Sequence, residues 1–288
     1  MKASILDNST ALRRAAVIGH PIAHSLSPRL FGLLARRLGF ALAYEKFDIS
    51  PDTLATAVEE ARREQRFTGW SVTLPHKIAV LALAGRVSPE ARRAGAANVL
   101  HFVDGVAVAH NTDGFGVLRT LQEQQFDPSV GSAVIFGAGG AARAVACAVA
   151  LAGSPLVLVC NRTRQRAQSL CADLALHFPS TVFRPVSSAC ELQAPIGLVV
   201  NATSLGLPSN PGGLPCPVLE PGALAFDVVY ASEATPFLRD AAGRGARTVD
   251  GLDMLVWQAL AAWEIWFGPV DEASAVKRSL KALLQEKE

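Results

Sequence analysis

Apolar residues in the first third of the chain form short runs that alternate with stretches of helical spacing. The run at residues 15–22 ends in a proline-containing turn, and residues 28–39 then carry apolar positions at helical intervals. Further strands are predicted at 43–49 and 69–73, with a helix at 51–64 between them. This alternation predicts an α/β fold with a mainly parallel sheet.

A β-hairpin is predicted at residues 98–109. Two apolar segments there flank Asp104 and Gly105, a dipeptide that suits a two-residue hairpin turn. One edge of the first sheet is therefore expected to be antiparallel.

The middle of the chain shows the order strand, glycine-rich loop, helix, strand. An apolar strand at 132–136 is followed at once by GAGGAA at 137–142. An alanine-rich helix at 141–151 and a strand at 155–160 come next. This is the context that a dinucleotide-binding fingerprint requires, so we predict a Rossmann-type domain here.

The second sheet is expected to continue with strands at 198–201 and 224–229. The segment 206–222 between them is rich in Pro and Gly and is expected to be an exposed loop. Apolar residues at 252–267 predict a helix with Gln258 as its polar interior candidate. We expect this helix to return to the first domain.

Length and composition suit two domains with buried cores, since the chain has 288 residues of which 50% are hydrophobic. We place a substrate-binding domain in residues 1–112 and 251–288, and a dinucleotide-binding domain in 113–250. The formal net charge of +2, without a block of Lys or Arg, argues against a nucleic-acid partner. Because no apolar run spans a membrane and no signal-peptide pattern is present, we expect a cytoplasmic monomer or homodimer.

The five cysteines are scattered, and neither they nor the histidines show the spacing of a metal site. We expect reduced, buried cysteines, structural histidines and no metal. The tryptophans Trp257, Trp263 and Trp266 recur at helical spacing, which favours packing.

Each small residue of the glycine loop has a distinct expected role. Gly137 permits the tight turn, Gly139 lets the backbone approach a pyrophosphate, and Ala142 allows close packing of the helix on the strand. The helix N-terminus adds free N–H groups and the positive end of its dipole. The alternative is a glycine turn in an ordinary α/β unit.

The residues after the second strand of this unit select the cofactor. Proteins that bind NAD usually carry Asp or Glu about 20 residues beyond the loop, to accept hydrogen bonds from the ribose 2′-hydroxyl. This chain instead has NRTRQR at 161–166, with Arg162 and Arg166 able to pair with a 2′-phosphate. We therefore predict NADP(H) as the cofactor. The alternative is a solvated basic start of a helix.

Lys77 and Asp113 are the candidate catalytic pair. Lys77 ends the sequence GWSVTLPHK, and Asp113 lies in NTDG. Delivering hydride to a ketone carbon builds negative charge on its oxygen, which a protonated amine stabilises and protonates. A neighbouring carboxylate keeps that amine charged and oriented. The alternatives are a surface lysine at a helix start and a helix N-cap.

Ser25 and Ser27 occupy alternate positions of VIGHPIAHSLSP, in a loop after a strand. Two hydroxyl donors at this spacing can converge on one anionic group. The alternative is a polar turn with a helix cap.

Eight short motifs together resemble the shikimate dehydrogenase family over nearly the whole chain. In order they are HSLSP, GWSVTLPHK, AGAANV, HNTDG, GAGGAARA, NRTRQR, NATSLG and GLDMLVWQAL. The resemblance implies reversible, NADP-dependent reduction of 3-dehydroshikimate to shikimate, a step toward aromatic amino acids. The alternatives are a quinate/shikimate dehydrogenase with broader substrate or NAD use, and a non-catalytic regulatory homologue.

The resemblance also implies a role for individual residues. Lys77 and Asp113 match the catalytic pair of the family. The residues that match its substrate contacts are Ser25, Ser27, Thr73, Asn98, Asp113, Tyr230 and Gln258. The residues that match its cofactor site are Gly137, Ala138, Gly139, Gly140, Ala141, Asn161, Arg162, Thr163, Arg166, Thr203, Val228 and Gly251.

The chain departs from the commonest family pattern at a few positions, which bear on substrate range and affinity. Ser71 stands where Asn is frequent, Val99 where Thr is usual, Phe31 where His is frequent, and Ala231-Ser232 where Asn-Pro follows the tyrosine. Ser71 keeps a hydroxyl but shortens its reach, so a weaker or water-bridged substrate contact is expected.

Overall fold

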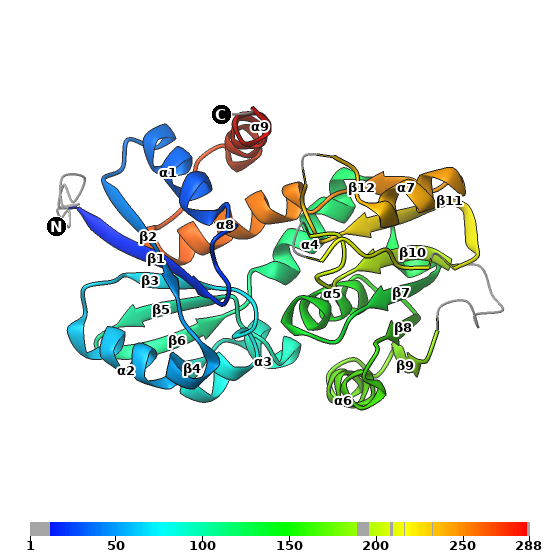
Figure 1. Cartoon of the computed structure of the whole chain (residues 1–288), viewed down its shortest axis with the longest axis horizontal. Helices are drawn as coiled ribbons and strands as arrows, with labels where there is room; N and C mark the ends of the chain where they lie inside the picture. Colours follow the sequence, from blue (N-terminus) through cyan, green and yellow to red (C-terminus); the bar gives the residue numbers. More distant parts are fainter. Residues whose placement is uncertain (1–11, 189–195, 208–209, 216, 232, 287–288) are drawn as a thin grey trace, which may run out of the picture.

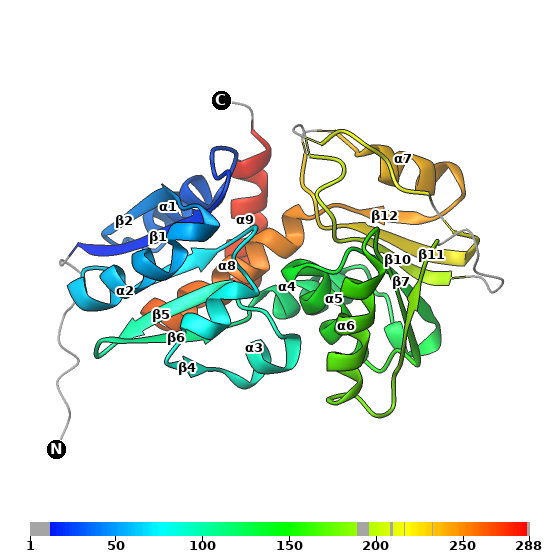
Figure 2. The same cartoon turned by 60° about the horizontal axis from the view of Figure 1, so that its bottom comes forward.

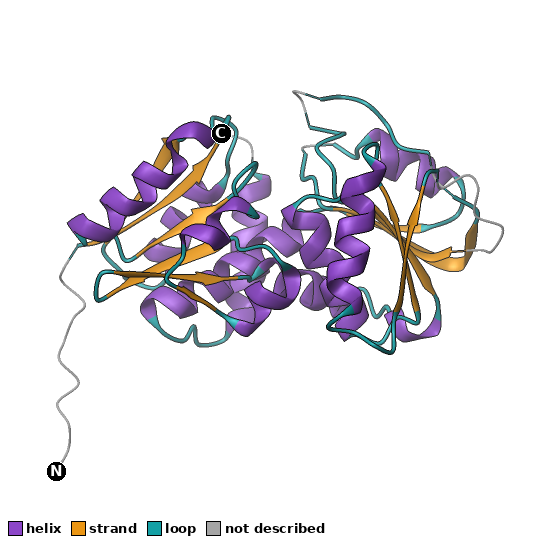
Figure 3. Ribbon diagram, turned by 90° about the horizontal axis from the view of Figure 1, so that it is seen from below, coloured by secondary structure: helices purple, strands orange, loops and turns teal. Residues whose placement is uncertain are grey.

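The computed structural model of the chain describes residues 12–188, 196–207, 210–215, 217–231 and 233–286. Within these residues, two six-stranded sheets lie side by side, each flanked by helices (Figures 1 and 3). The first has the strand order β2-β1-β3-β5-β6-β4, and the second β12-β11-β10-β7-β8-β9. The predicted α/β fold with two parallel-dominated sheets is confirmed.

The first sheet uses the N-terminal strands predicted from the apolar runs. Its strands are β1 (Arg13–Gly19), β2 (Leu42–Asp48), β3 (Gly69–Val72), β4 (Arg86–Val87), β5 (Val99–Val103) and β6 (Val106–His110). The intervening helices are α1 (Ser27–Arg37), η1 (Pro51–Thr53), α2 (Leu54–Glu64), η2 (Ala79–Leu83) and α3 (Pro89–Ala94).

The predicted hairpin is present, but the expectation of an antiparallel edge is wrong. Asp104 and Gly105 have φ values of 52° and 71°, as a tight turn of the mirror-image type requires. Strand β5 is antiparallel to both β3 and β6. The edge strand is β4, which runs parallel to β6 and is too short to leave an apolar pattern in the sequence.

The second sheet is parallel throughout its described pairs. Its strands are β7 (Ser132–Phe136), β8 (Leu156–Cys160), β9 (Val182–Val186), β10 (Ile196–Asn201), β11 (Leu219–Asp227) and β12 (Arg247–Val249). Its helices are α4 (Asp113–Glu123), α5 (Gly140–Leu151), α6 (Arg164–Ala175) and α7 (Pro236–Gly243), and η3 (Pro128–Val130) precedes β7. The order matches the Rossmann arrangement, whose halves diverge between β7 and β10 and open a crevice at the carboxyl ends of the strands.

The predicted exposed loop 206–222 extends too far, because β11 begins at Leu219. Leu219 pairs with Ile196, but the next pair joins Leu224 to Leu198, so the strand carries an irregular insertion. Pro221 and Gly222 fall inside that insertion, and these residue types are typical of loops and of irregular positions in strands.

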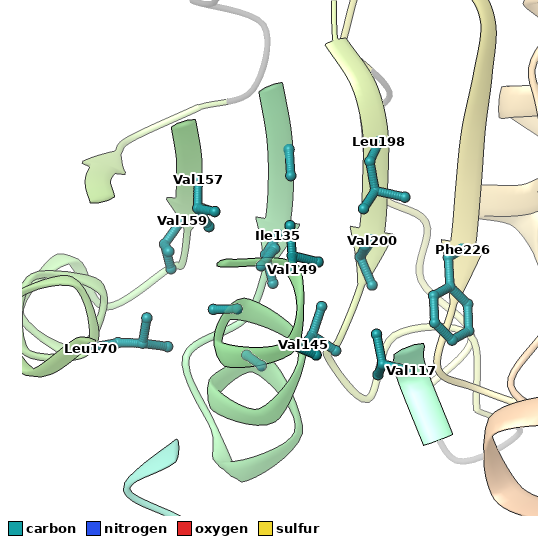
Figure 4. Close-up of a cluster of buried hydrophobic side chains, with 14 of the residues drawn as sticks. Val117, Ile135, Val145, Val149, Val157, Val159, Leu170, Leu198, Val200 and Phe226 are labelled. Carbon is teal, nitrogen blue, oxygen red and sulfur yellow. The ribbon is translucent and has the colours of Figure 1, made fainter. Parts of the chain in front are cut away.

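The core of the second sheet is built from apolar residues of the strands and of the helices that cover one face. Side chains from β7, β8, β10 and β11 point toward those of α4, α5 and α6 in Figure 4. Ala142 is fully buried in this cluster, which confirms its predicted part in packing the loop helix on the sheet.

The C-terminal helices α8 (Leu252–Phe267) and α9 (Ala273–Gln285) return to the first sheet, as predicted for 252–267. Trp257, Trp263 and Trp266 are buried in the cluster that α8 and α9 form with α1 and β1, and the Trp257 ring also meets Phe115 of α4, which confirms packing. Helix α8 also lies beside α4, between the two sheets (Figure 2). Gly116 makes this approach possible, because a Cβ at that position would lie 2.7 Å from the Met254 carbonyl oxygen.

Three of the cysteines lie in the described part of the chain and are present as thiols. Cys171 is buried and Cys147 and Cys160 are only partly so, which corrects the expectation that all are buried. Burial raises the pKa of Cys147 and of Cys171 to about 11, so both stay protonated at neutral pH. Cys190 and Cys216 lie outside the described residues. None of the helices described combines the length and apolarity needed to cross a bilayer.

A buried group of charges joins α4, α8 and α9. The Lys277 ammonium, on α9, contacts Asp253 of α8 and donates to Glu123 of α4 at 2.7 Å. Lys281 donates to the other Asp253 oxygen at 2.8 Å. Burial alone would raise the pKa of Asp253, but hydrogen bonds and charge from the two lysines outweigh it and lower the pKa below its usual value.

Replacing Lys277 by methionine is expected to lower the free energy of unfolding by about 3 kcal/mol at pH 7, because it leaves a buried carboxylate short of a partner. The Asp253 contribution is present above the unfolded-state pKa of 3.8 and is lost as the pH falls through the lowered folded-state value. Urea unfolding at pH 7 and pH 3 should therefore show a smaller difference between wild type and Lys277→Met in acid. Lys281→Met, at a more exposed lysine, is the control and should cost less. Equal stability of Lys277→Met and wild type at pH 7 would contradict this account.

Candidate active site

Lys77 and Asp113 form an ion pair at the junction of the two sheets. The Lys77 ammonium donates to the Asp113 Oδ2 atom at 2.5 Å, and the two side chains are 17% and 4% exposed. Lys77 lies in the loop after β3, where its carbonyl accepts from the Ala97 N–H at 2.7 Å. Asp113 begins α4, where the Asn111 Oδ1 atom, and not the Asp113 carboxylate, accepts from the Gly114 N–H at 3.1 Å. The lysine is thus paired, and the aspartate serves the ion pair rather than the helix end.

The buried His76 helps to fix the loop that carries Lys77. Its Nε2 atom lies 2.7 Å from the Ile49 carbonyl oxygen, and its side chain is almost fully buried. This contact ties the loop to the segment after β2, which agrees with a structural histidine. No group of three or more His, Cys, Asp or Glu side chains in the described residues is placed to hold a metal ion.

Gly140 brings the glycine loop against Lys77. A Cβ atom at Gly140 would overlap the Lys77 Cβ atom, so only glycine allows this approach. The contact joins the first turn of α5 to the loop after β3. Sequence reasoning gave Gly140 only a cofactor role and missed this contact.

A cavity of about 720 Å³ runs between the two sheets and gathers residues from both. It is lined by every predicted site residue except Arg162 and Thr163. Its other lining residues include Ser71, Arg143, Ser169, Ser204, Met254 and Leu255, none of which was predicted as a ligand contact except Ser71.

The serine pair lines the cavity from the segment that joins β1 to α1. Ser27 is the first residue of α1, and its N–H donates to the Ser25 hydroxyl oxygen at 3.3 Å. Leu26 precedes the helix and its side chain does not cap it, so the Ser25 hydroxyl satisfies the first N–H of α1, as a polar turn at a helix start would. Tyr230 comes from the loop after β11, and burial raises the pKa of its phenol against a backbone interaction with Leu26. The tyrosine is therefore protonated beside the serine loop.

Asn98 and Gln258 belong to a buried hydrogen-bond network that also holds Thr112. The Asn98 amide donates to the Thr112 hydroxyl at 2.8 Å and to Gln258 Oε1 at 3.0 Å. Its Oδ1 atom accepts from the Thr112 N–H at 2.7 Å. This network fixes the backbone immediately before Asp113. The NTDG motif was the signal that could have identified Thr112.

The glycine loop has the geometry that its sequence predicts. Gly137 has a φ of +110°, and a Cβ there would lie 2.8 Å from the Ala202 carbonyl oxygen. At Gly139 no atom lies within 4 Å of the corresponding position, which leaves open space at the N-terminus of α5. Backbone N–H groups and the positive end of the helix dipole face this space, so the residues present fit the pyrophosphate of a dinucleotide.

The segment 161–166 flanks the same end of the cavity. Asn161 and Arg166 line it, whereas Arg162 and Thr163 are exposed beside it. Asn161 donates to the Thr163 carbonyl at 2.9 Å and so shapes the turn before α6. Arg143, missed by sequence reasoning, also lines this end and donates to Asp173 at 2.7 Å.

The loops after β10 and β11 are fixed by a buried polar network around Asp227. Asn201 donates to Asp227 Oδ1 at 2.9 Å, and Thr235 donates to Oδ2 at 2.6 Å. Burial raises the pKa of Asp227 despite these hydrogen bonds. Asn201 Oδ1 in turn accepts from the Thr203 N–H at 3.0 Å and its hydroxyl at 2.7 Å. The network thereby orients Thr203 at the cavity wall.

Val228 and Gly251 lie together at the same wall. A Cβ at Gly251 would overlap the Val228 carbonyl, so glycine is required where α8 begins. This places the start of α8 within the crevice of the second sheet.

The departures from the family pattern have different structural consequences. Ser71 lines the cavity, while Val99 and Phe31 are fully buried in the core. Ala231 is exposed, and Ser232 lies outside the described residues. Of these positions, Ser71 alone among the described residues faces the cavity.

A Rossmann sheet whose glycine loop meets a lysine–carboxylate pair across a cavity defines a dinucleotide-dependent oxidoreductase. Residues 17–100 match the shikimate dehydrogenase substrate binding domain, and residues 251–272 match the shikimate 5′-dehydrogenase C-terminal domain. A shikimate dehydrogenase (NADP⁺) of Acidiphilium cryptum is 43% identical over 257 residues, covering 89% of this chain and 91% of the relative. The corresponding protein of Paracoccus denitrificans is 42% identical over 258 residues, covering 88% and 90%. The chain therefore belongs to the shikimate dehydrogenase family.

Solved structures agree with this membership. The shikimate 5-dehydrogenase of Thermus thermophilus, in complex with NADP(H) and shikimate, superimposes with a TM-score of 0.81 at 37% identity, covering 94% of this chain and 99% of that one. The ligand-free 5-ketofructose reductase of a Gluconobacter strain superimposes with a TM-score of 0.80 at 30% identity, covering 95% and 99%.

Proposed function

We propose that this protein is an NADP-dependent shikimate dehydrogenase, which reversibly reduces 3-dehydroshikimate to shikimate. The observation that carries the proposal is the 2.5 Å ion pair of Lys77 and Asp113, set between the glycine loop and the serine pair in one cavity. The NADP(H) and shikimate complex of the Thermus thermophilus relative supports both ligands.

We propose residues 1–112 and 251–288 as the substrate-binding domain and residues 113–250 as the NADP-binding domain. Support comes from the strand order, because the first sheet uses only strands before residue 112 and the second only strands after it. Packing of α8 and α9 on the first sheet supports the return of the C-terminal segment.

At the substrate end, we propose that Ser25, Ser27 and Tyr230 bind the carboxylate, since all three are hydroxyl donors at one end of the cavity. The ring hydroxyls and the reacting ketone then face the polar groups farther in. These are Thr73, Lys77, Asn98, Asp113 and Gln258.

In the reduction, the Lys77 ammonium donates its proton to the ketone oxygen as negative charge develops there. Asp113 accepts a hydrogen bond from the amine and so orients it. In the reverse direction, neutral Lys77 takes the proton of the substrate hydroxyl. NADP(H), when bound, supplies or accepts the hydride.

At the cofactor end, we propose that the glycine loop residues Gly137 to Ala141 hold the pyrophosphate. Asn161, Arg162, Thr163 and Arg166 would hold the adenosine ribose and its 2′-phosphate. Thr203, Val228 and Gly251 also line the cavity and would hold the nicotinamide ring.

The test of this function is NADPH formation, followed by absorbance, when the protein is supplied with shikimate and NADP⁺. We expect shikimate with NADP⁺ to give the highest kcat/KM. Quinate with each cofactor and shikimate with NAD⁺ are the comparison reactions. A higher kcat/KM with quinate or NAD⁺ would favour the broader quinate/shikimate enzyme. No turnover with any pair would favour a non-catalytic homologue and overturn the proposal.

We further propose that the enzyme is cytoplasmic, works as a monomer or homodimer, and needs no nucleic-acid partner. Light scattering of the purified chain checks the oligomeric state. A stable assembly larger than a dimer would contradict that part of the proposal.

A further inference from the structure

Tyr44, which no motif singled out, lies behind the serine end of the cavity. Its hydroxyl donates to the Ser71 hydroxyl oxygen at 2.7 Å. Ser71 is 8% exposed and lines the cavity, whereas Tyr44 does not line it. Any effect of Tyr44 on a ligand must therefore pass through the side chains that it contacts, and Ser71 is the one to which its hydroxyl donates.

The sheet explains how the tyrosine reaches this position. Tyr44 on β2 is in register with Ala15 on β1, and Ala15 is in register with Gly69 on β3. Ser71 lies two residues beyond Gly69, so it faces the same side of the sheet. Because Ala15 and Gly69 are small, the ring can extend across β1 toward Ser71.

The ring has little freedom to turn away. Phe31 of α1 stacks on Tyr44 with ring centroids 4.3 Å apart and planes 8° from parallel. Phe31 is itself buried against Trp266 of α8, with centroids 5.4 Å apart. The hydroxyl of Tyr44 is thus held in place by its own aromatic surroundings.

The direction of this hydrogen bond leaves Ser71 ready to donate. Burial raises the pKa of Tyr44, against hydrogen bonds with Ser71 and Ser27, so the phenol stays protonated. With its oxygen accepting from the phenol, the Ser71 hydroxyl hydrogen has no protein acceptor among the described residues. Ser25 is arranged in the same way, since its oxygen accepts from the Ser27 N–H. Both hydroxyls can therefore point their hydrogens at one anionic group.

We propose that Tyr44 is a positioning residue that orients Ser71 as a further hydrogen-bond donor to the substrate carboxylate, beside Ser25 and Ser27. This inference rests on the proposed function. It also replaces the expectation of a weak Ser71 contact, because an oriented donor to a charged acceptor forms a strong hydrogen bond.

The test compares Tyr44→Phe, Ser71→Ala and the double variant, with shikimate and with its methyl ester, at saturating NADP⁺. Tyr44→Phe keeps the stacked ring and removes only the hydroxyl. We expect it to raise the KM for shikimate about five- to tenfold, with kcat changed less than about twofold. Ser71→Ala should raise this KM at least as much. The KM for the methyl ester should change less than about twofold, because its acyl group carries no charge.

The double variant separates orientation from independent effects. If Tyr44 acts through Ser71, adding Tyr44→Phe to Ser71→Ala should change the KM for shikimate by less than about twofold. Thr181→Val is the matched control, since it deletes a buried hydroxyl that bonds the Ser154 carbonyl far from the cavity. It should lower thermal stability and leave both KM values unchanged.

Three outcomes would overturn the inference: an unchanged KM for shikimate in Tyr44→Phe, equal changes for acid and ester, or additive effects of the two substitutions. If Tyr44→Phe does not fold, Ser71→Ala decides alone, and equal changes for acid and ester in that variant overturn the inference. Wild-type turnover with shikimate distinguishes these results from a failure of the proposed function itself.

Discussion

Replacing Lys77 by methionine is expected to lower kcat by about a hundredfold or more, while NADP⁺ still binds. Methionine keeps most of the apolar stem that packs on Gly140 and removes the ammonium that would protonate the ketone oxygen. Steady-state rates in both directions measure the loss. Fluorescence titration with NADP⁺ measures the retained affinity.

Lys281→Met is the matched control for this variant. Lys281 also pairs with a buried aspartate, at 2.8 Å from Asp253, but it does not line the cavity. Its replacement should lower the free energy of unfolding, because Asp253 loses an ion-pair partner. The kcat should stay within about twofold of wild type, because Lys281 does not line the cavity. Near-normal turnover of Lys77→Met would remove the lysine from the chemistry.

The ion pair predicts that Asp113 and Lys77 contribute to kcat as a unit. If the carboxylate acts by holding the ammonium, Asp113→Asn should also lower kcat strongly. The double variant should then be little worse than Lys77→Met, since residues that act as a unit are not additive. Independent, multiplying losses would indicate that Asp113 acts on the substrate directly.

Those parts of the site that form continuous short motifs could be predicted from the sequence. Lys77, Asp113 and the glycine loop lie in segments whose residue types already suggest their chemistry, and the structure brings them together. Ser71 was noticed only because it departs from a pattern. Tyr44 could not be found in this way, since its contact with Ser71 depends on the register of three strands.

The same distinction holds for the fold. The continuous apolar run at 132–136 predicts β7 at its observed bounds, and the run at 15–22 overlaps β1, which begins two residues earlier and ends three residues earlier. The two-residue β4 leaves no periodic signal, and the insertion in β11 puts Pro and Gly inside a strand. The contact of Gly140 with Lys77 joins segments that follow strands of two different sheets, so the local sequence pattern cannot predict it.

Cofactor choice depends on the two arginines that follow β8. Replacing Arg162 and Arg166 together by glutamine is expected to lower the ratio of kcat/KM with NADP⁺ to that with NAD⁺ about a hundredfold, because each loses a charge-assisted contact with the 2′-phosphate. Arg166 lines the cavity and Arg162 does not, so the single Arg166→Gln variant should account for most of the change. Steady-state kinetics with both cofactors at fixed ionic strength give the ratio.

Arg164 provides the control that distinguishes contact from net charge. It lies between the two arginines on the chain, but its guanidinium donates to the Ser187 hydroxyl at 3.3 Å and does not line the cavity. Arg164→Gln should leave the ratio of kcat/KM with NADP⁺ to that with NAD⁺ within about twofold of wild type. Raising the salt concentration should lower this ratio in the wild type, because the arginine side chains are exposed and salt screens their charges. If all three arginines changed the ratio equally, a diffuse positive field would explain the preference for NADP⁺, and specific recognition of the 2′-phosphate by Arg166 would be wrong.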